Sequence, residues 1–174
     1  MALELTIDTN LDEEIKTSRI IQKSSLDKRD YFYRTLENGL KILIISDPTV
    51  KFSACAFRVD TGSYEDPDEY SGLAHFLEHM LFLGSKKYPD SDEYNNFFSK
   101  HGGYTNAWTD DDYTTYNFDI AEHEEFYNAL DRTTEFFISP LFTEKYVDKE
   151  LNAVDSEFKM DFQDDSWRYW SVMG

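Results

Sequence analysis

The sequence predicts an α+β domain, in which a mixed or mainly antiparallel sheet is covered on one face by helices. Three strand-like segments precede the first helix, and the strong hairpin signal Asn38-Gly39 separates the first two. Two further strand segments surround an acidic turn at residues 110–112. Amphipathic segments with helical spacing fill most of the remaining chain.

The expected strands are short apolar runs bounded by turn formers, and we expect all of them in one sheet. In chain order they are residues 31–36, 40–45, 52–59, 104–109 and 113–120.

The expected helices follow from apolar residues at intervals of three and four. The first would bury most of its surface, including Leu73 and Leu77, and Gly84 would end it. Asp90 or Ser91 would cap the second, and Glu93 would complete a capping box if Asp90 is the cap. In chain order the helices are residues 72–83, 90 or 91 to 100, 122–138, and about 143 to beyond 162.

We expect two regions along the chain. Residues 1–30 are polar and weakly patterned, typical of an N-terminal arm. Residues 31–174 contain no repeat or linker and form one domain. The aromatic end, residues 167–174, stops without a cap or polar tail, so we expect this domain to be incomplete at its C-terminus.

Charge and composition exclude several classes of partner. The 174 residues include 17 Lys+Arg and 35 Asp+Glu, giving a formal charge of −18. Such a chain would be repelled by nucleic acid and by anionic membranes. An aromatic content of 17% is too high for a disordered acidic segment, so the chain is expected to bury a core.

The sequence carries no sign of secretion or of membrane insertion. Cys55 is the only cysteine and lies in an apolar stretch, so we expect it to be buried and unpaired. The N-terminal residues lack the apolar core of a signal peptide, and no run approaches the length of a transmembrane helix. We therefore expect a cytoplasmic protein.

The clearest chemical feature is His75-Phe-Leu-Glu78-His79, within the most apolar predicted helix. On a helix, Glu78 lies about 60° to one side of His75 and His79 about 40° to the other, so all three project from one face. Two imidazoles one turn apart can bind one metal ion, and a carboxylate beside them can reach a water held on that metal. The alternative, a pair of hydrogen-bonded core histidines, would bury three ionisable groups at high energetic cost.

A third metal ligand should come from a later element. Glu150 and Glu157 lie seven residues apart, so on a helix they point within about 20° of one direction. One could bind the metal while the other holds a histidine by a hydrogen bond. Their spacing does not decide which does which.

Three segments in this order resemble the insulysin and nardilysin branch of the pitrilysin family, the zinc proteases with an inverted His-x-x-Glu-His motif. They are GLAHFLEHMLFLGSKKYP at residues 72–89, KHGGYTNA at 100–107 and NAVDSE at 152–157. The resemblance extends from about Tyr31 to Trp167.

The resemblance implies a single Zn²⁺ ion bound by His75, His79 and Glu157, with Glu78 as general base. Glu150 would then be the supporting acid. It also implies that the strand holding Asn106 and Ala107 is an exposed sheet edge, where a peptide substrate would pair as an added strand.

The implied function is a zinc metalloendopeptidase that hydrolyses peptides and small unfolded polypeptides. Members of this branch are several times longer, and their C-terminal halves contribute to the reaction. We therefore expect this chain to be the N-terminal part of the catalytic domain, with the remaining domains as partners. The alternative is a non-catalytic zinc-binding or scaffold fragment, inactive without those domains. The substrate preference and the oligomeric state stay open.

The remaining polar features have simpler interpretations. We expect His101 to interact with a helix C-terminus and His123 to be exposed. The turn at residues 110–112 is expected to be solvated, although its carboxylates could attract basic peptides.

Overall fold

A computed structural model describes residues 21–161, 163–165 and 168–169. The chain divides into two compact units, Met1–Val50 and Lys51–Gly174. Most of the predicted N-terminal arm, the end of the last predicted helix and most of the aromatic C-terminal segment lie outside the described residues.

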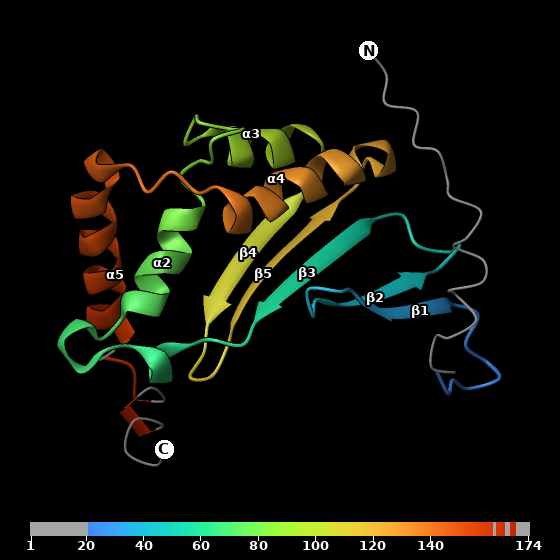
Figure 1. Cartoon of the computed structure of the whole chain (residues 1–174), viewed down its shortest axis with the longest axis horizontal. Coiled ribbons are helices and arrows are strands. Elements are labelled where there is room, and N and C mark those ends of the chain that lie inside the picture. Colours follow the sequence, from blue (N-terminus) through green and yellow to red (C-terminus); the bar gives the residue numbers. More distant parts are fainter. Residues whose placement is uncertain (1–20, 162, 166–167, 170–174) are drawn as a thin grey trace. The chain divides into compact units, whose positions relative to one another are not determined.

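In the first unit, β1 (Asp30–Thr35) and β2 (Lys41–Ser46) pair as an antiparallel hairpin (Figure 1). The backbone N–H of Gly39 donates to the carbonyl of Leu36, and Gly39 adopts φ +87°, which glycine tolerates without strain. The hairpin predicted at Asn38-Gly39 is therefore confirmed.

The sheet of the second unit contains β3 (Ser53–Val59), β4 (Tyr104–Thr109) and β5 (Thr114–Ile120). All pairings are antiparallel and the order is β3-β5-β4. The expectation of one sheet is wrong for the described strands, because β1 and β2 pair only with each other in a separate two-stranded sheet. Alternation of apolar residues specifies the two faces of a strand but not its neighbours.

Among the described residues of the second unit are four α-helices: α2 (Leu73–Leu81), α3 (Glu93–Lys100), α4 (Phe126–Ile138) and α5 (Val147–Asp161). Short 3₁₀ turns at Ser63–Glu65, Asp68–Tyr70, His123–Glu125 and Glu144–Tyr146 connect the longer elements. Within this unit α4 lies over the strands and α5 lies beside α2 (Figure 1).

The core forms where α2, α3 and α4 meet one face of the sheet. Tyr116, Phe118 and Ile120 alternate along β5 and are almost completely buried, as a strand with one packed face requires. The ring of Phe118 lies 5.1 Å from that of Phe98 in α3. Each buried aromatic side chain of this kind contributes about 1.5–3 kcal/mol to folding. The predicted α+β class, with an antiparallel sheet and helices on one face, is confirmed.

One side of α2 is less buried than its sequence predicts. Leu73 and Leu77 are 44% and 43% exposed. They line an open groove together with Tyr116 and Phe137. The apolar face that the sequence pattern predicts for α2 is therefore wider than the part of the helix surface that the other described residues cover.

The loop before α2 fixes both the start of the helix and the β4–β5 turn. The Asp66 carboxylate accepts hydrogen bonds from the backbone N–H groups of Gly72 (2.7 Å) and Ala74 (2.8 Å), which have no partner within the helix. Gly62 lies so close to the turn that an added Cβ would stand 2.2 Å from the carbonyl oxygen of Asp110. The loop, the helix and the turn are therefore positioned together.

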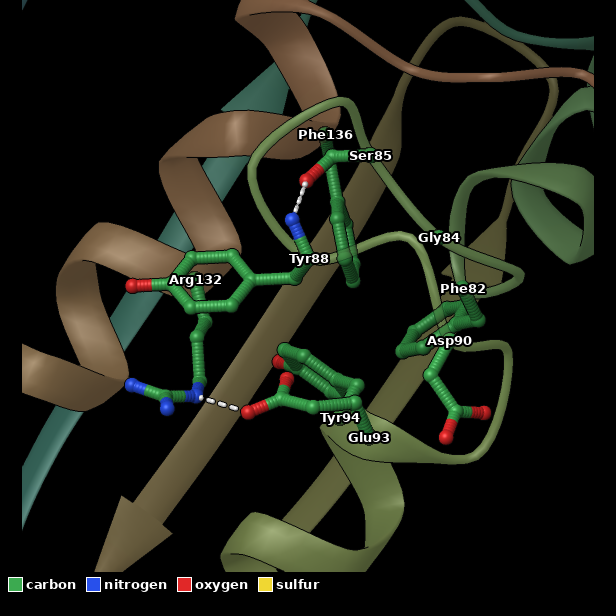
Figure 2. Close-up of a pocket in the computed structure, with 9 residues that line it drawn as sticks. All are labelled: Phe82, Gly84, Ser85, Tyr88, Asp90, Glu93, Tyr94, Arg132 and Phe136. Atoms are coloured by element: carbon green, nitrogen blue, oxygen red, sulfur yellow. Dashed lines mark hydrogen bonds and ion pairs between the residues drawn. The ribbon is translucent and has the colours of Figure 1, made fainter.

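The start of α3 differs from the predicted capping box. Asp90 accepts a hydrogen bond from the backbone N–H of Asp92 at 3.0 Å, and Asp92 is the residue at the N-cap position. The Glu93 carboxylate accepts instead from Arg132 of α4, at 2.8 Å (Figure 2). A tertiary ion pair has replaced the local reciprocal bond, which sequence spacing alone does not reveal.

Figure 2 also shows the residues that line a small pocket, which come from the loop after α2, from α3 and from α4 and include this ion pair. The Ser85 hydroxyl accepts a hydrogen bond from the backbone N–H of Tyr88 at 3.1 Å, which closes the loop on itself. The Arg132 guanidinium stacks on the Tyr88 ring, 4.4 Å from its centroid. Contacts among the lining residues hold the loop against α4. None of the predicted site residues lines the pocket.

In the part of the chain that the structure describes, no helix combines the length and the apolar character needed to cross a membrane.

We predict that Asp66→Ala destabilises the second unit by about 1 kcal/mol, because two N–H groups at the start of α2 lose their acceptor. Urea denaturation of the wild type and the variant would measure the difference. Asp68→Ala removes an exposed carboxylate from the same loop and serves as the matched control. Equal stability of the wild type and Asp66→Ala would contradict the capping role.

We predict that Cys55 reacts slowly with iodoacetamide in the folded protein. Cys55 is partly buried, less than the sequence predicts. This burial still disfavours the thiolate and raises the pKa of Cys55 to about 11. At about pH 8 only roughly one thiol in a thousand would be ionised. Mass spectrometry after timed alkylation should reveal a rate at least about 100-fold below that of the urea-unfolded chain. Similar rates in both states would refute the burial argument.

Candidate metal centre

The centre is built around α2, which packs between α5 on one side and β4 on another. The side chains of Met80 and Leu81 are buried and attach the helix to the core. His75 and His79, one turn apart, point toward α5, while Glu78 reaches a residue of β4. One short helix therefore presents three ionisable side chains to two different neighbours.

The structure brings His75, His79 and Glu157 together. The two Nε2 atoms lie 3.2 Å apart. One Glu157 carboxylate oxygen lies 3.4 Å from Nε2 of His75 and 3.5 Å from Nε2 of His79. These three residues form a group that could hold a metal ion, and each is only partly buried.

Glu150 occupies a different position from Glu157. Its carboxylate lies 3.2 Å from Nδ1 of His79, and the residue is 8% exposed. With the His79 proton on Nδ1, this contact is a hydrogen bond that leaves the Nε2 lone pair free for a metal. The two glutamates, seven residues apart on α5, therefore contact different nitrogens of the His79 ring. Glu150 lies at Nδ1 and Glu157 at Nε2.

The donor set fits a zinc ion. Zinc binds imidazole nitrogen at about 2.0–2.1 Å and carboxylate oxygen at about 2.0–2.2 Å, so two ligands of a tetrahedral ion lie roughly 3.3–3.5 Å apart. The three separations between the donor atoms are 3.2, 3.4 and 3.5 Å. Two imidazoles and one carboxylate also leave a fourth position open, as in catalytic rather than structural zinc sites.

Glu78 is the most buried acid of this group, at 7% exposure. Its carboxylate accepts a hydrogen bond of 2.6 Å from the hydroxyl of Thr109, at the end of β4. The buried phenol of Tyr116 is nearby: burial raises its pKa, and the charge of Glu78 adds to the effect.

Asn106 and Ala107 lie on β4, opposite Asn117 and Tyr116 of β5. Since the order of the sheet is β3-β5-β4, β4 is an edge among the described strands. Asn106 is exposed, whereas Ala107 packs against the core. On its other side β4 pairs with none of the described strands.

The other histidines lie outside this group. His101 occupies the C-cap position of α3, the helix end expected for it, and its Nδ1 atom also lies 2.7 Å from the Glu122 carboxylate. His123 is exposed, as predicted, with Nδ1 2.7 Å from the Ser53 hydroxyl. The three aspartates of the turn at residues 110–112 are also exposed, as predicted.

Sequence reasoning missed two residues that support the centre, Asp66 and Thr109. The Asp66 carboxylate caps α2 from a loop, and no spacing rule links it to the helix. The strand pattern could have identified Thr109, because it lies two residues after Ala107 and therefore on the same face of the predicted strand.

Comparisons with known proteins identify the family of the chain. The family described as Insulinase (Peptidase family M16) matches residues 41–168. Insulin-degrading enzyme of Homo sapiens is 49% identical over 152 residues, which cover 87% of this chain and 15% of that protein. A-factor-processing enzyme of Saccharomyces cerevisiae is 44% identical over 164 residues, 94% of this chain and 16% of that protein.

A solved structure described as pitrilysin has the same fold, with a TM-score of 0.76 and 41% sequence identity, and the match covers 80% of this chain and 15% of that one. The chain thus spans about 15% of the length of the curated relatives. Because the family match covers most of the described residues and the fold agrees, the chain belongs to the insulinase family of zinc metallopeptidases, peptidase family M16.

Proposed function

We propose that this chain carries the active site of a zinc metalloendopeptidase that hydrolyses peptides and small unfolded polypeptides. The observation that carries the proposal is the convergence of His75, His79 and Glu157 at tetrahedral ligand spacing, on the helix that also carries Glu78. The names of the relatives, insulin-degrading and A-factor-processing enzyme, support a peptide substrate.

In this proposal His75, His79 and Glu157 hold the ion, and Glu150 keeps His79 in the required tautomer and orientation. Zinc, when bound, supplies polarisation of the scissile carbonyl and lowers the pKa of water toward about 7. Glu78 takes the proton from the attacking water and later delivers it to the leaving amide nitrogen. The products are two peptides, and no side chain becomes covalently attached to the substrate.

The free edge of β4 supports the proposed mode of substrate binding. A peptide in extended conformation would pair with the backbone at Asn106 and Ala107 as an added strand. Backbone pairing recognises an extended shape more than a particular sequence, which is consistent with unfolded polypeptides as substrates.

A second candidate is a zinc-binding fragment that cleaves nothing without further domains. The observation that favours it is the length of the chain, about 15% of the length of its relatives. In either case the remaining domains of a longer protease are the expected partners, and a cytoplasmic location stays a prediction from the sequence.

We predict one zinc ion per chain after dialysis, and its loss in His75→Ala and Glu157→Ala, because each variant removes one of three ligands. Elemental analysis would measure the stoichiometry. His123→Ala, which removes an exposed histidine outside the group, should retain zinc. Zinc that survives both ligand variants would contradict the proposed site.

We predict that Glu78→Gln retains zinc but loses about 10²- to 10⁴-fold in hydrolysis of a quenched peptide, because the amide cannot accept the proton. The assay should use both this chain and the longest native polypeptide that contains it. Zinc without hydrolysis in this chain, together with hydrolysis in the longer form, would favour the second candidate. Full activity of Glu78→Gln in an active form would refute the general-base role.

A further inference from the structure

We infer that Thr109 is a positioning residue, whose hydroxyl holds the Glu78 carboxylate in the orientation that proton transfer requires. The inference rests on the proposed function, in which Glu78 is the general base. It assigns a role to a residue outside the His-x-x-Glu-His motif and outside the set of metal ligands.

The contact itself is short and directional. The Thr109 Oγ1 hydroxyl donates to Oε2 of Glu78 at 2.6 Å, a length typical of an O–H group bonded to a carboxylate. Glu78 is 7% exposed, so water offers little alternative to this donor. A buried carboxylate loses substantial stabilisation when such a donor is removed.

Thr109 is also held in place by its surroundings. It is the last residue of β4 and pairs with Thr114 of β5. The following turn is closed by a 2.8 Å hydrogen bond from the N–H of Asp110 to the carbonyl of Tyr113, and the N–H of Ser63 donates to the Asp110 carbonyl at 3.0 Å. A threonine side chain is itself restricted about χ1. The donor is therefore more rigid than the glutamate that it anchors.

This anchoring matters because a glutamate has several rotatable bonds and proton transfer depends on geometry. A misplacement of about 1 Å can reduce a catalysed rate by about 100-fold. Ala107, on the proposed substrate-pairing strand, and Thr109 share one face of β4. One strand would thus fix both the peptide backbone and the base relative to each other.

The test compares Thr109→Val, which keeps the shape and removes the hydroxyl, with Thr109→Ser, which keeps the hydroxyl. Thr105→Val removes a hydroxyl from the same face of the same strand and is the matched control. Kinetics should be measured on the longest native polypeptide that hydrolyses peptide, with zinc content and thermal unfolding measured on every variant. A crystal structure of metal-free Thr109→Val would report the Glu78 conformation independently of activity.

We expect Thr109→Val to lower kcat by about 10- to 100-fold while KM and zinc content stay unchanged. Thr109→Ser should recover most of kcat, and Thr105→Val should resemble the wild type. The metal-free crystal structure of Thr109→Val should have Glu78 in more than one conformation.

Wild-type kcat in Thr109→Val would overturn the inference, as would a loss of zinc or a change confined to KM. A kcat loss that Thr109→Ser does not reverse, with Glu78 unmoved, would also overturn it. These results are distinct from failure of the proposed function, in which Glu78→Gln would retain activity or the wild type would not hydrolyse peptide.

Discussion

The packing of α2 between β4 and α5 is the constraint on which the site depends. The same nine-residue helix must bury Met80 and Leu81 in the core and also bring His79 to Glu150 and Glu78 to Thr109. Because residues three and four apart share a helix face, small changes in the rotation of α2 would break contacts with both neighbours together. The cap from Asp66 fixes where that helix begins. The helix ends at Leu81, before Gly84, the residue that the sequence predicted to end it.

Electrostatics explains why a cation suits this arrangement. Glu78, Glu150 and Glu157 place three carboxylates around two imidazoles, two of them in positions that are less than a tenth exposed. Carboxylates gathered in this way repel each other and lose hydration. A divalent ion between the imidazoles and Glu157 would offset much of that repulsion. The hydrogen bonds from Thr109 and His79 support the two buried carboxylates that would not contact the ion.

The parts of the protein that sequence predicted well depend on local periodicity. The hairpin, the helices and the common face of His75 and His79 all follow from residue spacing within one element. The roles of Glu150 and Glu157 could not be separated, since their spacing places both on the same side of α5 and only the packing against α2 distinguishes them. The single sheet and the capping box were wrong because strand pairing and the Glu93–Arg132 ion pair are tertiary interactions.

The close approach of Gly62 to the β4–β5 turn gives this position an influence beyond its own loop. A larger side chain there would collide with the backbone carbonyl of Asp110, the residue directly after Thr109. Relief of that collision would shift the end of β4, and with it the hydroxyl bonded to Glu78. Gly62 would therefore affect the geometry around Glu78, although a glycine has no side chain with which to bind metal or transfer a proton.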